Sequence, residues 1–143
     1  SAASEVSPAN VEQLEVAWTV HTGDVADGKP PFGATSSFQL TPILVDGTLY
    51  ACTPFDRVLA LDPATGEQRW SFDPRIDKSA RYANQFVCRG VASWTDEAAE
   101  ADAVCRQRIF LGTLDARLIA LDARIDPNAS HSLIPHVFAA HVA

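Results

Sequence analysis

Short stretches in which apolar and polar positions alternate, separated by turn residues, dominate this chain. Residues 14–20 alternate with a period of two, which predicts a half-buried strand. The same reasoning predicts further strands over 39–45, 48–53, 57–61 and 68–72. Asp46-Gly47 is a two-residue hairpin turn of the type that favours positive φ, and residues 24–35 read as a loop. No segment sustains a helical period, so we expect an all-β sandwich, barrel or propeller.

An internal repeat with an offset of 60 residues decides among these folds. Arg57-Val-Leu-Ala-Leu-Asp62 reappears as Arg117-Leu-Ile-Ala-Leu-Asp122, and the strand before it repeats at the same offset. Each unit comprises about four strands, which is the size of a propeller blade. We therefore expect about two blades of a propeller. The first blade is expected at 36–78 and the second at 86–124, preceded by an opening segment with a closing strand at 1–24 and followed by an untypical tail at 125–143.

The first repeat ends in the stretch Ala60-Leu-Asp62-Pro-Ala-Thr65-Gly66-Glu-Gln-Arg-Trp70. We expect Asp62 to accept hydrogen bonds from turn amides, Gly66 to adopt a left-handed conformation and Trp70 to pack its ring between neighbouring blades. This pattern resembles the tryptophan-docking motif of quinoprotein propellers, and Trp18 stands where an earlier repeat would place its own Trp. The second repeat departs from the pattern after Asp122, with no Thr-Gly and no Trp.

Three further stretches resemble dehydrogenases that use pyrroloquinoline quinone (PQQ). Residues 10–24 look like the start of their propeller, and residues 41–50 look like their first blade. Val87-Cys-Arg-Gly-Val91 is similar to the glucose/quinate branch of that family. The resemblance covers residues 8–124 and implies an eight-bladed propeller, incomplete here, in which PQQ lies over the central axis and Ca²⁺ bridges the quinone.

The resemblance also implies which residues bind the cofactor. Arg89 is expected beside the quinone, paired with its acidic edge, because a guanidinium stays charged and forks onto carboxylates; the alternative is a structural Arg at a strand end. Gln39 stands where relatives have a Glu that contacts a cofactor carboxylate, or is an ordinary solvent-facing residue. Gly90 lets the backbone approach closely, and Cys88 completes this set. The metal ligands and the catalytic base of the family come from later blades, so none is assigned to this chain.

Cysteine and histidine spacing suggests no further site. Cys88 and Cys105 lie near opposite ends of a hairpin if Val91 faces Ile109, too far apart for a bridge, so we expect free thiols. Three histidines recur every five residues: His131, His136 and His141. Neither a helix nor a strand would place all three side chains on the same side at this spacing, which argues against a metal site.

Charge and composition limit the function. The net charge of −7 argues against binding to a nucleic-acid backbone, and no apolar run reaches the ~18–20 residues of a membrane span. With no Met, the chain reads as a piece of a larger protein. The resemblance implies that this parent is periplasmic and that any attachment to a membrane is made through parts outside this chain. We expect that parent to oxidise a sugar or alcohol and to pass electrons to a quinone or cytochrome. The isolated chain is expected to be inactive and to associate either with the remaining blades of the propeller or with a second copy of itself. The alternative is a non-catalytic propeller module that binds a protein partner.

Overall fold

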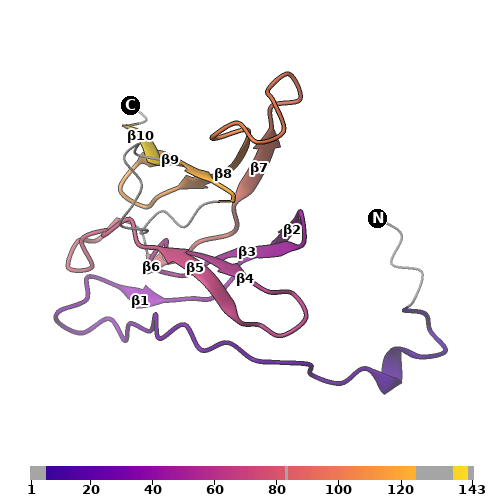
Figure 1. The fold of residues 1–143 in the computed structure, drawn as a ribbon. Helices are drawn as coiled ribbons and strands as arrows, with labels where there is room; N and C mark the ends of the chain where they lie inside the picture. Colours follow the sequence, from indigo (N-terminus) through magenta and orange to yellow (C-terminus); the bar gives the residue numbers. More distant parts are fainter. Residues whose placement is uncertain (1–5, 83, 125–136, 142–143) are drawn as a thin grey trace.

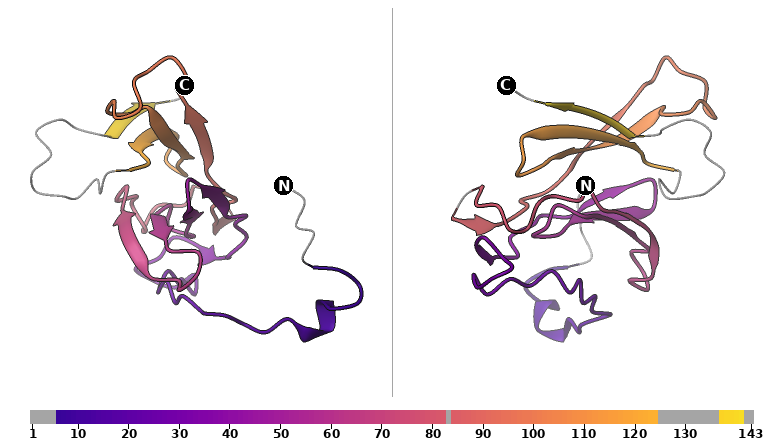
Figure 2. Two further views of the ribbon diagram at one scale, coloured as in Figure 1. Left: turned by 45° about the vertical axis from the view of Figure 1, so that its right-hand side comes forward. Right: turned by 90° about the vertical axis from the view of Figure 1, so that its left-hand side faces the viewer.

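The structure, a computed structural model, describes residues 6–82 and 84–124 together with the backbone of 137–141. The described chain is all-β except for one short 3-10 helix, η1 (Val11–Gln13). Two four-stranded antiparallel sheets form separate layers, as Figures 1 and 2 show from three sides. A short parallel pair, β1 (Thr35–Ser36) and β6 (Gln85–Phe86), forms a third sheet.

The first sheet has the strand order β2-β3-β4-β5, so each strand pairs with its neighbour in sequence. Its strands are β2 (Ile43–Val45), β3 (Thr48–Cys52), β4 (Val58–Leu61) and β5 (Gln68–Phe72). Asp46 and Gly47 connect the first two with φ angles of 44° and 69°, which confirms the predicted hairpin turn. The strand predicted over 39–45 pairs in this sheet only from Ile43 onward.

The second sheet has the order β10-β9-β8-β7. Its strands are β7 (Ala92–Thr95), β8 (Gln107–Gly112), β9 (Arg117–Asp122) and β10 (Val137–His141). Ser93, not Val91, lies opposite Ile109, so the expected hairpin register was wrong by two residues. The range 125–143, which matches no repeat in sequence, contributes β10 as the outer strand beside β9.

Residues 14–20 do not form the strand that their alternation predicts. They follow η1 as an extended segment along the first sheet, and none of the described residues pairs with them in a ladder. Leu14 is 62% exposed and Val16 is 83% exposed. A period of two marks residues that suit a pleated sheet, but a strand also needs a neighbour to pair with, which the pattern does not report.

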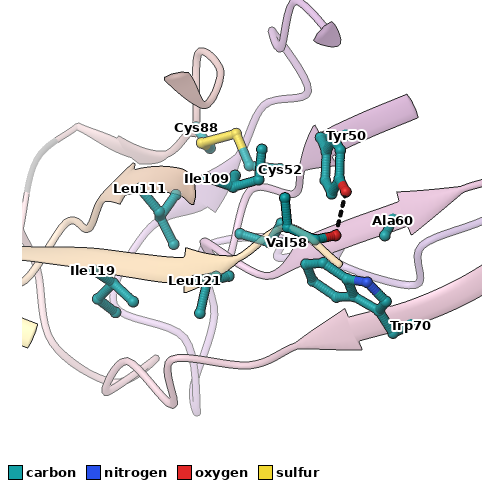
Figure 3. Close-up of a cluster of buried hydrophobic side chains, with 11 residues drawn as sticks. Tyr50, Cys52, Val58, Ala60, Trp70, Cys88, Ile109, Leu111, Ile119 and Leu121 are labelled. Atoms are coloured by element: carbon teal, nitrogen blue, oxygen red, sulfur yellow. Dashed lines mark hydrogen bonds between the residues drawn. A yellow bond between two sulfur atoms is a disulfide. The ribbon is translucent and has the colours of Figure 1, made fainter. Parts of the chain in front are cut away.

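The principal core lies between the two large sheets. Tyr50, Val58 and Trp70 from the first sheet pack in one buried cluster with Ile109 and Leu121 from the second (Figure 3). The Tyr50 hydroxyl donates a 2.5 Å hydrogen bond to the Ala123 carbonyl, which satisfies a polar group within this apolar contact. Phe86, Phe55 and Ile76 belong to a second cluster. Among the described residues, no helix has the length and apolar character to cross a membrane.

Candidate cofactor site

The four residues expected at the cofactor lie on two adjacent segments. Residues 35–41 and 85–90 run parallel, first as the β1–β6 pair and then through an isolated bridge between Thr41 and Gly90. The Ser37 amide donates to the Phe86 carbonyl over 2.9 Å, and the Thr41 amide donates to the Arg89 carbonyl over 3.0 Å. Each segment leads into β2 or β7, the edge strand of its sheet. The fold therefore brings Gln39 and residues 88–90 to one strip.

Arg89 and Gln39 both expose their side chains on this strip. The Gln39 amide donates to the Ser37 hydroxyl over 2.9 Å, which uses one of its two N–H groups. The Arg89 guanidinium makes no hydrogen bond or ion pair with any residue that the structure describes. The strip thus presents a cationic fork and an amide that are available to an anionic ligand.

Gly90 lies where the two segments are in close contact. Its φ is 155°, a conformation that other residues rarely adopt, and a Cβ there would lie 3.2 Å from the Thr41 carbonyl oxygen. A side chain at position 90 would therefore press on the neighbouring segment. Glycine keeps the two segments in contact next to Arg89.

The cysteine expectation was wrong. Cys52 and Cys88 form a disulfide with their Cα atoms 5.9 Å apart, while Cys105 is a buried free thiol. Cys52 ends β3 and Cys88 precedes β7, so the two sulfurs meet only when the two sheets pack together (Figure 3). Sequence reasoning compared Cys88 with Cys105 in one hairpin and missed this partner from the preceding repeat.

An ion pair holds the turn between β3 and β4, which follows Cys52 directly in sequence. Arg57 forks onto Asp24, with its Nε 3.0 Å from one carboxylate oxygen and an Nη 2.8 Å from the other. The Thr53 hydroxyl donates to the same carboxylate, and Arg57 also donates to the Thr22 carbonyl over 2.5 Å. Both Thr53 and Asp24 are buried. The pair ties the opening segment to the first sheet.

The second repeat reuses this arrangement with one change. Arg117, the counterpart of Arg57, donates to the Pro74 carbonyl over 2.8 Å, as Arg57 does to Thr22. Its carboxylate partner is the local Asp115 rather than a residue from the preceding segment. The Arg117 guanidinium holds the pKa of Asp115 below its usual range. A repeated Arg therefore joins each hairpin to the chain that precedes it.

Asp56 is a buried carboxyl that links the two repeats. It is 1% exposed, and one of its oxygens accepts a 2.7 Å hydrogen bond from the Leu114 amide. The other oxygen has no hydrogen-bond partner among the described residues. Burial raises the pKa of Asp56 to about 6, with Asp115 adding to the rise and the Leu114 amide and Arg117 opposing it. Sequence analysis did not single this residue out, because nothing local predicts its burial.

The turn after β4 has the geometry that its sequence indicated. Asp62 accepts hydrogen bonds from the Ala64 and Thr65 amides at 2.9 and 3.1 Å, and the φ of Gly66 is 74°. The Trp18 ring lies directly on this turn, because a Cβ at Gly66 would meet it at 2.6 Å. Its indole N–H donates to the Pro63 carbonyl over 3.1 Å. The opening segment is thereby attached to the outer end of the first sheet.

Metal ligands do not gather in the part of the chain that can be described. No group of three or more His, Cys, Asp or Glu side chains there has the spacing to hold an ion. His131 and His136 lie outside the described residues, and His141 is described only by its backbone in β10.

Comparison with known proteins identifies the class to which this fold belongs. Residues 1–126 match the family model described as the β-propeller domain of PQQ glucose/ethanol/alcohol dehydrogenases. The crystal structure of the quinohemoprotein alcohol dehydrogenase from Comamonas testosteroni superposes with a TM-score of 0.51 and 36% identity, over 63% of this chain and 12% of that one. The chain belongs to the PQQ-dependent quinoprotein dehydrogenase family.

Relatives in sequence include both sugar and alcohol enzymes. Quinoprotein glucose dehydrogenase A of Acinetobacter calcoaceticus is 34% identical over 130 residues, which are 83% of this chain and 16% of that protein. Quinoprotein glucose dehydrogenase of Escherichia coli is 37% identical over 123 residues, or 83% of this chain and 15% of that protein. The chain thus spans about a sixth of the length of these relatives.

Proposed function

We propose that this chain forms one side of the cofactor site in a PQQ-dependent dehydrogenase that oxidises a sugar or alcohol. The observation that carries the proposal is the convergence of Arg89, Gly90 and Gln39 on two hydrogen-bonded segments. Family membership supplies the cofactor class, and the exposed guanidinium, which none of the described residues pairs with, supplies a reason for it to bind here. The two large sheets are proposed as two blades of the eight in the parent propeller, with Trp18 and Trp70 in docking positions.

The residues of the strip fit the chemistry of PQQ. The cofactor carries carboxylates on a planar quinone, and Arg89 can form a forked, charge-assisted pair with such a group. Gln39 has a second amide N–H for a neighbouring carboxylate oxygen, and Gly90 leaves its backbone uncovered. The cofactor role of Cys88 is proposed to be indirect, through its bridge to Cys52.

The division of labour follows from what this chain contains. When bound, PQQ supplies the two-electron chemistry that converts an alcohol carbon to a carbonyl. This chain's residues would bind the cofactor: Arg89 would pair with one of its carboxylates, and the Gln39 amide would donate a hydrogen bond to it. The general base and the Ca²⁺ ligands are proposed to come from other blades, as are the contacts to the substrate and to a quinone or cytochrome acceptor. On its own, the chain is therefore expected to be inactive.

The disulfide supports a periplasmic location. Protein disulfides form and persist in oxidising compartments, and the bacterial periplasm is one. Cys52 and Cys88 are almost completely buried, as expected for a structural bridge. We propose that the parent protein is periplasmic.

Replacing Arg89 in the intact parent protein tests the proposal. Arg89→Ala removes a charge-assisted contact, so PQQ affinity in the presence of Ca²⁺ should fall about 10- to 100-fold. Arg89→Lys keeps the positive charge but loses the forked geometry, so its PQQ affinity should lie between those of the wild type and of Arg89→Ala. Arg69→Ala is a matched control, because Arg69 lies on β5, at the opposite edge of the first sheet from β2. Titration of apo protein monitored by PQQ absorbance gives the dissociation constants.

Two outcomes would contradict the proposal. Unchanged affinity in Arg89→Ala would assign that residue a structural role at a strand end. Failure of the intact wild-type protein to bind PQQ would favour the non-catalytic propeller module instead.

A further inference from the structure

We propose that the Cys52–Cys88 disulfide is a positioning device for Arg89. It would act by clamping residues 88–90 to the end of β3, so that the backbone that carries the guanidinium is held in place before the cofactor arrives. The effect of this clamp on cofactor binding rests on the proposed cofactor role of Arg89. The clamp itself can be tested without the cofactor.

The bridge lies immediately beside the residue that it would position. Cys88 precedes Arg89, and the Cys88 sulfur lies 3.5 Å from the carbonyl oxygen of Gly90, on the other side of Arg89. Cys52 is 0% exposed and Cys88 is 6% exposed, so the covalent link is part of the core rather than of the surface. Both also belong to the cluster of buried side chains between the sheets. The exposed Arg89 side chain therefore extends from a backbone that is anchored on its buried side.

Phe86 anchors the start of this segment in the second cluster, but the described residues supply few hydrogen bonds to hold residues 87–90. The β1–β6 ladder is only two residues long, and beyond it the segment is held by the single amide bonds from Ser37 and Thr41. Isolated backbone hydrogen bonds near the surface open readily. The disulfide is the covalent restraint on residues 85–90, and fixing a binding group in advance lowers the ordering cost of binding.

The opposite end of the bridge is firmly held. Cys52 closes β3 and is followed by the fully buried Thr53, whose amide donates to the Arg57 carbonyl over 2.9 Å. Arg57 is in turn forked onto Asp24. A clamp requires one fixed side, and this buried turn provides it.

The first measurement reads the clamp alone. In the intact apo protein, Cys52→Ala/Cys88→Ala should increase amide exchange at Thr41, whose N–H is bonded to the Arg89 carbonyl, by about tenfold or more. Cys105→Ala is the matched control, because it removes a buried cysteine without breaking a bridge. If the double variant fails to fold, wild-type protein reduced with a phosphine and alkylated serves the same measurement. Unchanged exchange at Thr41 would overturn the proposal.

The second measurement asks whether the clamp acts through Arg89. PQQ affinity of the double variant should fall about tenfold, which corresponds to the cost of ordering the backbone of about one residue on binding. In an Arg89→Ala background the same double substitution should cause no further loss, because the group that it positions is gone. An equal tenfold loss in both backgrounds would show a general structural role and overturn the proposal. If Arg89→Ala alone left affinity unchanged, the cofactor role of Arg89 would fail, while exchange at Thr41 would still decide the clamp.

Discussion

The buried carboxyl of Asp56 makes the stability of this fold depend on pH in an unusual direction. Its pKa is about 6 in the folded chain, against 3.8 for an ordinary Asp. Between these two values the folded state binds more protons than the unfolded state. The free energy of unfolding therefore falls as pH rises from about 4 to 6, and levels off above that range. A shift of about two pKa units corresponds to about 3 kcal/mol.

Asp56→Asn removes this titration while preserving much of the local geometry. The amide oxygen can still accept from the Leu114 amide, and Asn tolerates the positive φ of 59° at this position. The new NH₂ replaces the oxygen that has no partner, which adds a pH-independent cost of about 1–3 kcal/mol. The informative quantity is consequently the difference between variant and wild type as a function of pH, and not its value at one pH.

Urea denaturation of the 143-residue chain at a series of pH values from 4 to 8 provides the assay. The variant should gain about 3 kcal/mol relative to wild type between pH 4 and pH 8. Asp77→Asn is the matched control, because hydrogen bonds from Ser79 lower the pKa of the exposed Asp77 and this carboxyl stays ionised in both states above pH ~5. A pH-independent difference for Asp56→Asn would refute the burial argument.

Two further substitution pairs test the contacts that attach the opening segment. Gly66→Ala and Gly47→Ala both place a side chain at positive φ and should each cost about 1 kcal/mol, but only the first Cβ meets the Trp18 ring. The Trp18 indole N–H resonance should therefore shift and exchange faster in Gly66→Ala alone; an unchanged resonance would contradict the stacking. Arg57→Ala should lower the free energy of unfolding by about 3 kcal/mol because it leaves the buried Asp24 carboxylate without its partner. Lys29→Ala, from the exposed pair with Asp27, should cost less than about 1 kcal/mol, and similar losses for both in urea denaturation would argue against a buried ion pair.

Much of the fold is readable from local sequence. Strands β3, β4 and β5 lie where the period-two pattern predicts them, and Gln68–Phe72 matches to the residue. Asp46-Gly47 and the turn from Asp62 to Gly66 behave as their residue types require, because positive φ and side-chain-to-amide bonds act within four residues. The offset repeat and the Cys-Arg-Gly-Val stretch also indicated the family that the comparisons show.

The candidate site was predictable only in part. Arg89, Gly90 and Gln39 were chosen by resemblance, and the structure places them on adjacent segments, while their binding role stays a prediction. The bridge from Cys88 to Cys52 was missed, because it joins residues 36 positions apart on different sheets.

What the sequence alone determined is therefore local: where strands and turns fall, which units repeat and which family they resemble. Tertiary structure decided which elements meet. It left residues 14–20 unpaired among the described strands, added β10 beside β9, forked Arg57 onto Asp24 and buried Asp56. These outcomes depend on contacts between residues far apart in sequence. A pattern with a period of two reports the face on which a residue lies, but not the residue that it will face.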